Sequence, residues 1–282
     1  MRPFLNRRNS QFRFAHIRHA AILLAALLIS VIPLLAQAPA TLRIAAAADL
    51  EPVLPPILEQ FRKETGIQAE ATYQASAALT TQIQNGAPFD LFLSADLGYP
   101  KRLIDLGVAD TAGVLAANGF SDSSSPITYA RGTLVLWTRK DSHWPTPSLA
   151  TLSDPSLQRL AIANPDRAPY GKAAIAALTS LKLLDQLKPK FVTAQNIAQT
   201  AQFAETGNAD AGLISLTSAK TEHLSAIGNY YVLDSKLYPA IEQGAVIVTK
   251  STQRDKAHKF LDFLLSAPIQ QQLAKSGLTP VR

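Results

Sequence analysis

The sequence predicts an α/β protein in which mostly parallel sheets are flanked by helices. Short apolar runs, typical of buried strands, alternate along the chain with amphipathic segments of roughly 10–15 residues that are typical of helices. The 282 residues are 47% hydrophobic and include no cysteine, so an apolar core has to stabilise the fold without disulfides. Strands separated by helices favour a parallel sheet with helices on both of its faces.

The first forty residues are expected to be a secretory signal peptide rather than part of the fold. They contain five arginines and no acidic residue, and an apolar run at Ala20–Leu35 is followed by small residues up to Ala40. This order is that of an export signal. Cleavage is possible after Ala38 or after Ala40, and the second site is favoured because Pro39 would directly follow the cleaved bond at the first. The alternative is a membrane anchor, but about 16 apolar residues interrupted by Pro33 are too few for a span. We therefore expect a periplasmic protein.

The net charge of the chain comes almost entirely from this segment. The whole chain has 27 basic and 21 acidic residues, a formal charge of +6. Without the five arginines of residues 1–40, 22 basic residues remain against 21 acidic ones, a charge of +1. A nearly neutral mature protein gives no reason to expect a nucleic acid partner. A lipid anchor is not expected either, because a bacterial lipoprotein needs a cysteine at its cleavage site, and we expect a soluble monomer.

The first half of the mature chain is expected to alternate three strands with three helices. The strands are the apolar runs Thr41–Ala46, Ile67–Tyr73 and Phe89–Ser94. The helices are 53–65, 77–85 and 99–106. Prolines 52, 55 and 56 are compatible only with a first helical turn, and Ser76 is expected to cap the second helix. Glycines 66, 86 and 107 are expected to end the three helices.

The second half continues the same alternation. Its expected strands are Thr133–Thr138, Leu160–Ala163, Ala211–Ser215, Tyr230–Leu233 and Ala245–Thr249. Its expected helices are Gly171–Leu184, Ile197–Thr206 and Thr252–Leu265. The last helix has Phe260, Leu261 and Leu264 on one face, as a helix that packs on a core should. In such a fold ligands bind beyond the carboxyl ends of the strands, where helices begin.

No familiar catalytic signature is present in the chain. There is no Walker A loop, G-x-G-x-x-G, H-E-x-x-H or G-x-S-x-G pattern. Outside the leader, His143, His223 and His258 are scattered and lack the spacing of a zinc site. We therefore expect no enzyme activity, no cofactor and no cation site.

Small residues recur where helices are expected to begin. They are found at Ala45–Asp49, at Ala75–Ala78 and at Pro169–Gly171. Short side chains leave backbone N–H groups uncovered, and the N-terminus of a helix favours negative charge. Several such ends brought together would bind an anion without any lysine or arginine. Taken alone, the pattern is also compatible with ordinary capping and tight packing.

These junctions belong to a wider resemblance. The chain resembles the periplasmic molybdate-binding proteins of ABC importers, and the most specific block is SAALTTQIQNGAPFDLFLSAD at Ser76–Asp96. The resemblance starts at Ile44–Leu50 (IAAAADL) and continues through Pro169–Gly171, Asn196-Ile197 and Ala211–Ser215. It covers essentially the whole mature chain in order, and it favours a ligand site over plain capping.

The resemblance implies a two-lobed type II periplasmic binding protein fold with two crossing segments. Lobe 1 is expected at 41–130 plus 239–282 and lobe 2 at 131–238, with crossings near Ala130–Val135 and Tyr238–Val246. The implied function is capture of molybdate or tungstate between the lobes by neutral hydrogen-bond donors. The implied partner is an ABC importer permease in the inner membrane.

The resemblance also implies which residues hold the oxyanion. Ser76 matches the ligand serine of the family, and Ile197 matches an apolar residue that donates its backbone N–H. Tyr170 contributes either its N–H or its hydroxyl. At the first junction either Ala48 or Asp49 supplies the donor, and an ionised Asp49 is expected to turn away and give only its N–H, because a carboxylate repels a dianion. Ser215 stands where some members have tyrosine. This smaller side chain either enlarges the pocket, or Tyr170 takes over the function of the missing tyrosine.

Two other functions stay open at this point. The first is binding of another anion, such as sulfate, or of a small organic acid, for which Arg131, Arg167 and Lys172 are the available cations. The second is a secreted enzyme on the same scaffold, for which Asp49 and Tyr170 are the pair to test.

Overall fold

The computed structural model describes residues 41–112, 115–116, 119–120 and 124–281. These residues belong to one compact unit that starts at Pro39. The predicted signal peptide, residues 1–40, lies outside the described part of the chain. Within that part, no helix combines the length and the apolar character that crossing a membrane would require.

The first sheet is a mixed sheet built around β1. Its strand order is β2-β1-β3-β13-β4, and β7 also pairs with β13. β2 and β3 lie parallel to β1, whereas β13 runs antiparallel to β3, β4 and β7. The strands are β1 Leu42–Ala47, β2 Ala69–Gln74, β3 Leu91–Ser94, β4 Ala109–Asp110, β7 Ile127–Gly132 and β13 Ile241–Val248.

The second sheet has the order β10-β9-β11-β8-β12. β9 is parallel to β10 and β11, and β8 is antiparallel to β11 and β12. The strands are β8 Leu134–Arg139, β9 Leu160–Ala163, β10 Phe191–Ala194, β11 Ala211–Ser215 and β12 Gly228–Val232. A separate pairing joins β5 (Leu115–Ala116) to β6 (Gly119–Phe120).

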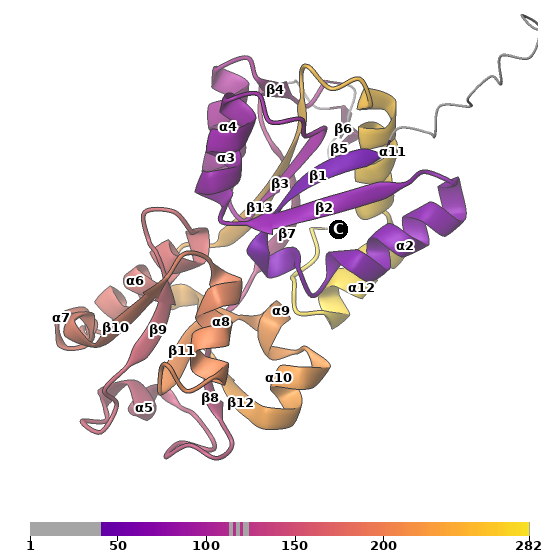
Figure 1. The fold of residues 1–282 in the computed structure, drawn as a ribbon. Helices are drawn as coiled ribbons and strands as arrows, with labels where there is room; N and C mark the ends of the chain where they lie inside the picture. The colour runs from indigo at the N-terminus through magenta and orange to yellow at the C-terminus, as the bar shows by residue number, and fades with distance from the viewer. Residues whose placement is uncertain (1–40, 113–114, 117–118, 121–123, 282) are drawn as a thin grey trace, which may run out of the picture. The chain divides into compact units, whose positions relative to one another are not determined.

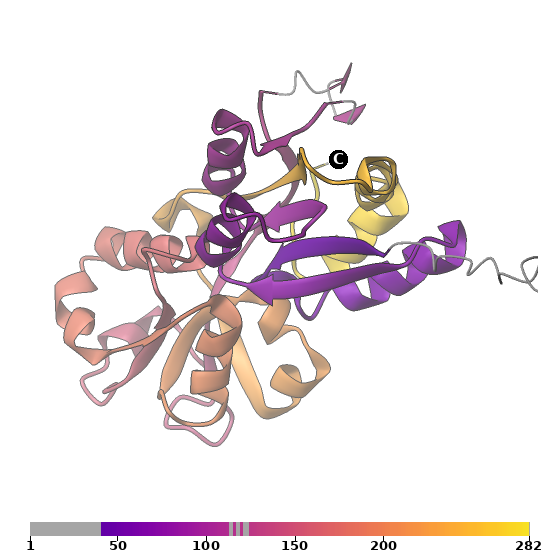
Figure 2. The same ribbon diagram turned by 45° about the horizontal axis from the view of Figure 1, so that its top comes forward.

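Helices cover both faces of the first sheet, because its strands bury side chains on both sides. Leu42 and Ile44 of β1 share a core with α2, α11 and α12, and Ala45 faces α3 and α4. Figure 1 shows these helices around the sheet, and Figure 2 shows the sheet edge between them. The helices are α2 Leu54–Thr65, α3 Ser76–Gln84, α4 Gly98–Asp105, α11 Arg254–Leu264 and α12 Ala267–Lys275.

The second sheet is covered in the same way. Leu134 and Leu136 of β8 pack with α5, α6 and α7, whereas Val135 and Trp137 pack with α8, α9 and α10. The helices are α5 Leu149–Ser153, α6 Pro169–Ser180, α7 Leu184–Leu187, α8 Ile197–Glu205, α9 Leu216–Ala219 and α10 Glu222–Ile227. Three 3₁₀ turns complete the described elements: η1 Ala48–Leu50, η2 Lys188–Lys190 and η3 Ser235–Leu237.

The chain passes between the two sheets twice. It leaves β7 at Gly132 and enters β8 at Leu134, and it leaves β12 at Val232 and enters β13 at Ile241. Glycine is required at 132 because a Cβ atom there would collide with the phenol of Tyr170. The limits of the two lobes, 41–130 plus 239–282 and 131–238, stay a prediction.

The predicted α/β class is confirmed, and most predicted strands and helices are found within two or three residues of their expected limits. Three details are wrong. Ser76 is the first residue of α3 and does not cap it, since Ala75 occupies the cap position. The helix expected at Gly171–Leu184 ends at Ser180, because Lys182 adopts a left-handed φ of 59°. Several elements, most of them short, were also not predicted: β4, β7, β10, α5, α7, α9, α10 and α12.

Candidate functional site

A small pocket lies where four helical segments begin, beyond the carboxyl ends of β1, β2, β9 and β10. These segments are η1, α3, α6 and α8. The cavity has a volume of about 10 Å³, so its walls lie close together. It is lined by Ala47, Ala48, Asp49, Gln74, Ala75, Ser76, Ala95, Ala168, Pro169, Tyr170, Asn196 and Ile197.

Five of the six residues predicted for the site therefore line one pocket. Asp49 lies in η1, Ser76 and Ile197 are the first residues of α3 and α8, and Tyr170 is the second residue of α6. An N–H group in a first helical turn has no carbonyl one turn earlier to donate to. Ala48 precedes Asp49 in the same turn. The pocket is thus surrounded by helix N-termini, which carry partial positive charge.

The hydroxyl of Ser76 is fixed in a geometry that keeps its hydrogen available. Its Oγ atom accepts a hydrogen bond of 3.1 Å from the N–H of Ala95. A serine hydroxyl has one hydrogen to donate besides the lone pairs with which it accepts. Ser76 is buried and lines the pocket. Its O–H is therefore a neutral donor that a ligand in the pocket can use.

Asp49 is fully buried and joins elements of both sheets. Its Oδ2 accepts a hydrogen bond of 3.0 Å from the hydroxyl of Tyr170 and a second bond from Nε2 of Gln243. Its carbonyl oxygen accepts a bond of 2.8 Å from Oγ1 of Thr217. The side chain of Asp49 is thus held by donors, while its N–H stays in the first turn of η1.

Burial dominates the acid–base properties of this group. It raises the pKa of Asp49 to about 6, although the hydrogen bonds from Gln243 and Tyr170 act in the opposite direction. Burial and the neighbouring carboxylate raise the pKa of Tyr170 well above its ordinary value. The phenol therefore stays protonated and donates to Asp49, so its hydroxyl is engaged and the contribution left to Tyr170 is its backbone N–H.

Ser215 is the predicted site residue that does not line the pocket. Its Oγ caps α9 by accepting a bond of 3.2 Å from the N–H of Ser218, and it shares a hydrogen bond of 2.9 Å with Oγ1 of Thr217. Thr217 in turn contacts the carbonyl of Asp49. Ser215 thus supports the backbone of η1 from behind and is separated from the cavity by Thr217 and Asp49.

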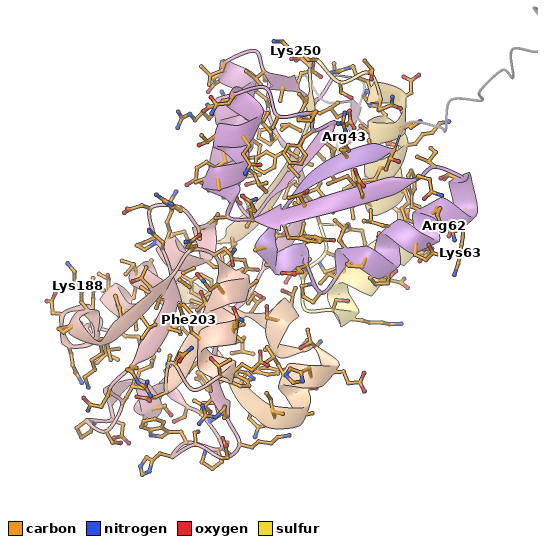
Figure 3. All side chains as sticks on the ribbon, viewed as in Figure 1. Arg43, Arg62, Lys63, Lys188, Phe203 and Lys250 are labelled. Atoms are coloured by element: carbon orange, nitrogen blue, oxygen red, sulfur yellow. The ribbon has the colours of Figure 1, made fainter. Side chains whose placement is uncertain are left out.

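No lysine or arginine is part of the pocket lining. Arg131 pairs with Glu242 at 3.2 Å, and Lys172 lies over the ring of Tyr99, 5.0 Å from its centroid. Arg167 has an exposed side chain. The basic residues labelled in Figure 3 also lie on outer helices and strand ends, away from the starts of α3, α6 and α8. Any attraction for an anion must therefore come from N–H and O–H dipoles.

Several contacts beside the pocket join elements of the two sheets. The hydroxyl of Tyr99 in α4 donates to the carbonyl of Asp166 at 3.3 Å, and the N–H of Ala77 donates to the carbonyl of Arg167 at 3.3 Å. Together with the bond between Tyr170 and Asp49, these contacts hold the walls of the pocket together.

Sequence reasoning missed two polar partners of the site. Gln243 is a buried glutamine in β13, and Thr217 lies in α9, just after β11. A lone buried glutamine among apolar strand residues is a visible anomaly, but only the pairing of β13 with β7 and β3 shows what it faces. Asn196 was quoted with Ile197, and its side chain caps α8 by accepting from the N–H of Gln199 at 2.9 Å.

The chemistry of the site is that of hydrogen-bond donation to a small acceptor. Among the described residues, no group of three or more histidine, cysteine, aspartate or glutamate side chains is placed to hold a metal ion. The pocket offers backbone N–H groups from four helix starts and the hydroxyl of Ser76. This set matches a compact anion that has acceptors on all sides.

Comparisons with known proteins point to one family. Residues 42–279 match the model of the bacterial extracellular solute-binding proteins. The molybdate-binding protein ModA of Azotobacter vinelandii is 36% identical over 225 residues, which cover 80% of this chain and 84% of that protein. ModA of Rhodobacter capsulatus is 32% identical over 217 residues, which cover 77% and 79% of the two chains. The solved structure of the Azotobacter vinelandii periplasmic molybdate-binding protein superimposes with a TM-score of 0.76 at 27% identity, covering 86% of this chain and all of that one.

Proposed function

This chain belongs to the bacterial extracellular solute-binding proteins, in the same family as the ModA proteins that it matches, and from this premise we propose that it captures molybdate in the pocket between η1, α3, α6 and α8. The single observation that carries the proposal is the meeting of four helix N-termini around one small cavity without a cation. The first donor comes from Ala48 or Asp49, and Ser76, Tyr170 and Ile197 supply the others.

The donor set accounts for binding of a dianion. Molybdate at neutral pH carries two negative charges and only acceptor atoms, so a site made only of donors suits it. A hydrogen bond to a charged group contributes about 1.5–3 kcal/mol. Five to seven such bonds from N–H and O–H groups support micromolar or tighter binding after the costs of ordering, at roughly 8 kcal/mol for 1 μM. Tungstate has the same charge and shape and is expected to bind as well.

The same geometry argues against the other two functions. A small organic acid needs a cation for its carboxylate, and Arg131, Arg167 and Lys172 do not line the pocket. The pair of Asp49 and Tyr170 is buried, and its phenol is held protonated as a donor. We propose that this pair is structural, and that the protein is a binding protein and not an enzyme.

The cellular role follows from the family. We propose that the mature protein is a monomer in the periplasm, free of a lipid anchor because the chain has no cysteine. Each sheet with its helices forms one lobe, and closure of the lobes over the oxyanion presents both to an ABC importer permease in the inner membrane. A resident cofactor plays no part in this role.

Calorimetry with separate solutions of molybdate, tungstate and sulfate tests the proposal. We expect molybdate and tungstate to bind much more tightly than sulfate, since donors spaced around the larger oxyanions lie too far from the oxygens of the smaller sulfate ion. Saturation at about 100 times Kd adds about 2.7 kcal/mol of stability, which for a chain of this size raises Tm by about 5–10 °C. Absence of both heat and a thermal shift with molybdate and tungstate would refute the proposal.

A further inference from the structure

The carboxylate of Asp49 is an unusual neighbour for a dianion. Asp49 is fully buried and lines the proposed oxyanion pocket. No ion pair recorded among the described residues includes it. Two negative groups without a counter-ion repel each other strongly at low dielectric. The site therefore requires some means of neutralising Asp49 when the oxyanion is bound.

The hydrogen bonds around Asp49 point to such a means. Oδ2 accepts from Tyr170 and from Nε2 of Gln243, but Oδ1 of Asp49 and Oε1 of Gln243 are buried and accept nothing from the described residues. Buried polar atoms without a partner are rare in folded proteins. Turning the Gln243 amide over would place its oxygen against Oδ2, and the mismatch would remain. A single proton on the carboxyl group resolves it, because a carboxylic acid and an amide pair through two hydrogen bonds.

The surroundings of Asp49 favour the neutral acid. Charged and titratable side chains on the elements around it are Glu51, Glu70, Tyr73, Tyr129, Arg131, Tyr170, Lys172, Glu205 and Glu242. Of these, Tyr129 and Tyr170 are the ones whose pKa values the carboxylate of Asp49 raises. Burial already places the pKa of Asp49 at about 6, and a dianion in the pocket raises it further.

We propose that Asp49 takes up a proton when the oxyanion binds, so that the bound ion faces a carboxylic acid paired with Gln243 rather than a carboxylate. This inference rests on the proposed function and adds proton-linked binding to it. The sign follows from linkage. The bound state has the higher pKa, so affinity is greatest at low pH, and it falls as pH rises towards the pKa of the bound state.

Calorimetry of the purified protein with sodium molybdate in two buffers of different ionisation enthalpy measures the proton uptake. At about pH 7 we expect about 0.5–1 proton per molybdate, and a Kd that tightens several-fold, at most tenfold per pH unit, as pH falls from about 8 to about 6. D49N carries a neutral isostere, so its uptake should be near zero and its Kd nearly constant over this range.

The matched control is D90N. Asp90 is also a buried aspartate, but it accepts from the N–H of Arg43 and from Ser251, away from the pocket. It should keep the proton uptake of the wild type. If D49N does not fold, Y170F serves instead, because loss of the donor to the carboxylate should move the pH window upward.

The outcomes separate the two proposals. Binding of molybdate without proton uptake by the wild type overturns the inference and leaves the proposed function standing. Equal uptake by wild type and D49N also overturns it, since the proton would then go elsewhere. Failure of the wild type to bind molybdate at any pH in the range refutes the proposed function itself.

Discussion

In the proposed site, Ser76 combines a structural hydrogen bond with an O–H group that a ligand can use. Its Oγ accepts from the N–H of Ala95, so its own hydrogen is available to the pocket. We expect Ser76→Ala to weaken molybdate binding by about 1–3 kcal/mol, because one charge-assisted hydrogen bond is lost. The variant also leaves the N–H of Ala95 without its partner, so some loss of stability is expected. Calorimetry for affinity and thermal unfolding without ligand measure the two effects separately.

Thr81→Ala is the matched control for this variant. Thr81 lies on the same helix, and its hydroxyl donates to the carbonyl of Ala77 on the exposed side of α3. We expect its affinity for molybdate to equal that of the wild type. An unchanged Kd in Ser76→Ala would remove the hydroxyl of Ser76 from the site.

At the residue scale, sequence reasoning identified residues that line the pocket better than it identified their contacts. Ser76, Tyr170 and Ile197 were placed by small-residue junctions and a family resemblance, and all three line the pocket. The bond between Tyr170 and Asp49 joins residues 121 positions apart. No local pattern encodes such a pairing, so the sequence left open whether Tyr170 uses its hydroxyl. The position of Ser215 behind η1 also depends on a long-range contact, the bond between Thr217 and the carbonyl of Asp49, so the sequence did not predict it.

The position of α6 depends on close contact between its first turn and the end of β9. A Cβ atom at Gly171 would lie closer to the carbonyl of Ala163 than van der Waals contact allows, and a backbone carbonyl cannot move aside as a flexible side chain can. We expect Gly171→Ala to shift the start of α6, and with it the N–H of Tyr170. Overpacking of this kind costs about 1–3 kcal/mol, and calorimetry should show molybdate affinity reduced by roughly tenfold or more.

Gly98→Ala is the control at the scale of an element. Gly98 is the first residue of α4, and a Cβ atom there meets nothing nearer than 3.8 Å. We expect wild-type affinity and stability for this variant. Wild-type affinity in Gly171→Ala would show that the pocket does not depend on the packing of α6 against β9.

The helices could be predicted from the sequence where a glycine ends them. Gly66, Gly86, Gly107 and Gly207 all have positive φ at or just after the ends of predicted helices. β7 and β10 lack such marks, and β10 has only one buried residue among Phe191–Ala194. Their strand character comes from pairing with β13 and β9. Tertiary pairing of this kind is invisible to local propensity.

Contacts between elements of the two sheets hold the whole molecule in its observed arrangement. Tyr99 makes two of them: its hydroxyl donates to the carbonyl of Asp166, and its ring lies under the ammonium group of Lys172. Both partners belong to the segment that leads into α6 and forms its first turn. Neither Tyr99 nor Lys172 lines the proposed oxyanion pocket. These contacts are therefore suited to controlling how fast the proposed ligand is released rather than which ion is bound.

We expect Tyr99→Ala to release molybdate faster than the wild type. An exposed cation–π contact contributes about 0.5–1 kcal/mol and a neutral hydrogen bond about 0.5–1.5 kcal/mol, so dissociation should accelerate by roughly 5–70-fold with little change in the association rate. Release of radiolabelled molybdate into an excess of unlabelled ion measures this rate. Tyr230→Ala, an exposed tyrosine on the edge strand β12, should release the ion at the wild-type rate. Equal dissociation rates for Tyr99→Ala and the wild type would mean that the two contacts of Tyr99 do not limit release of the ion.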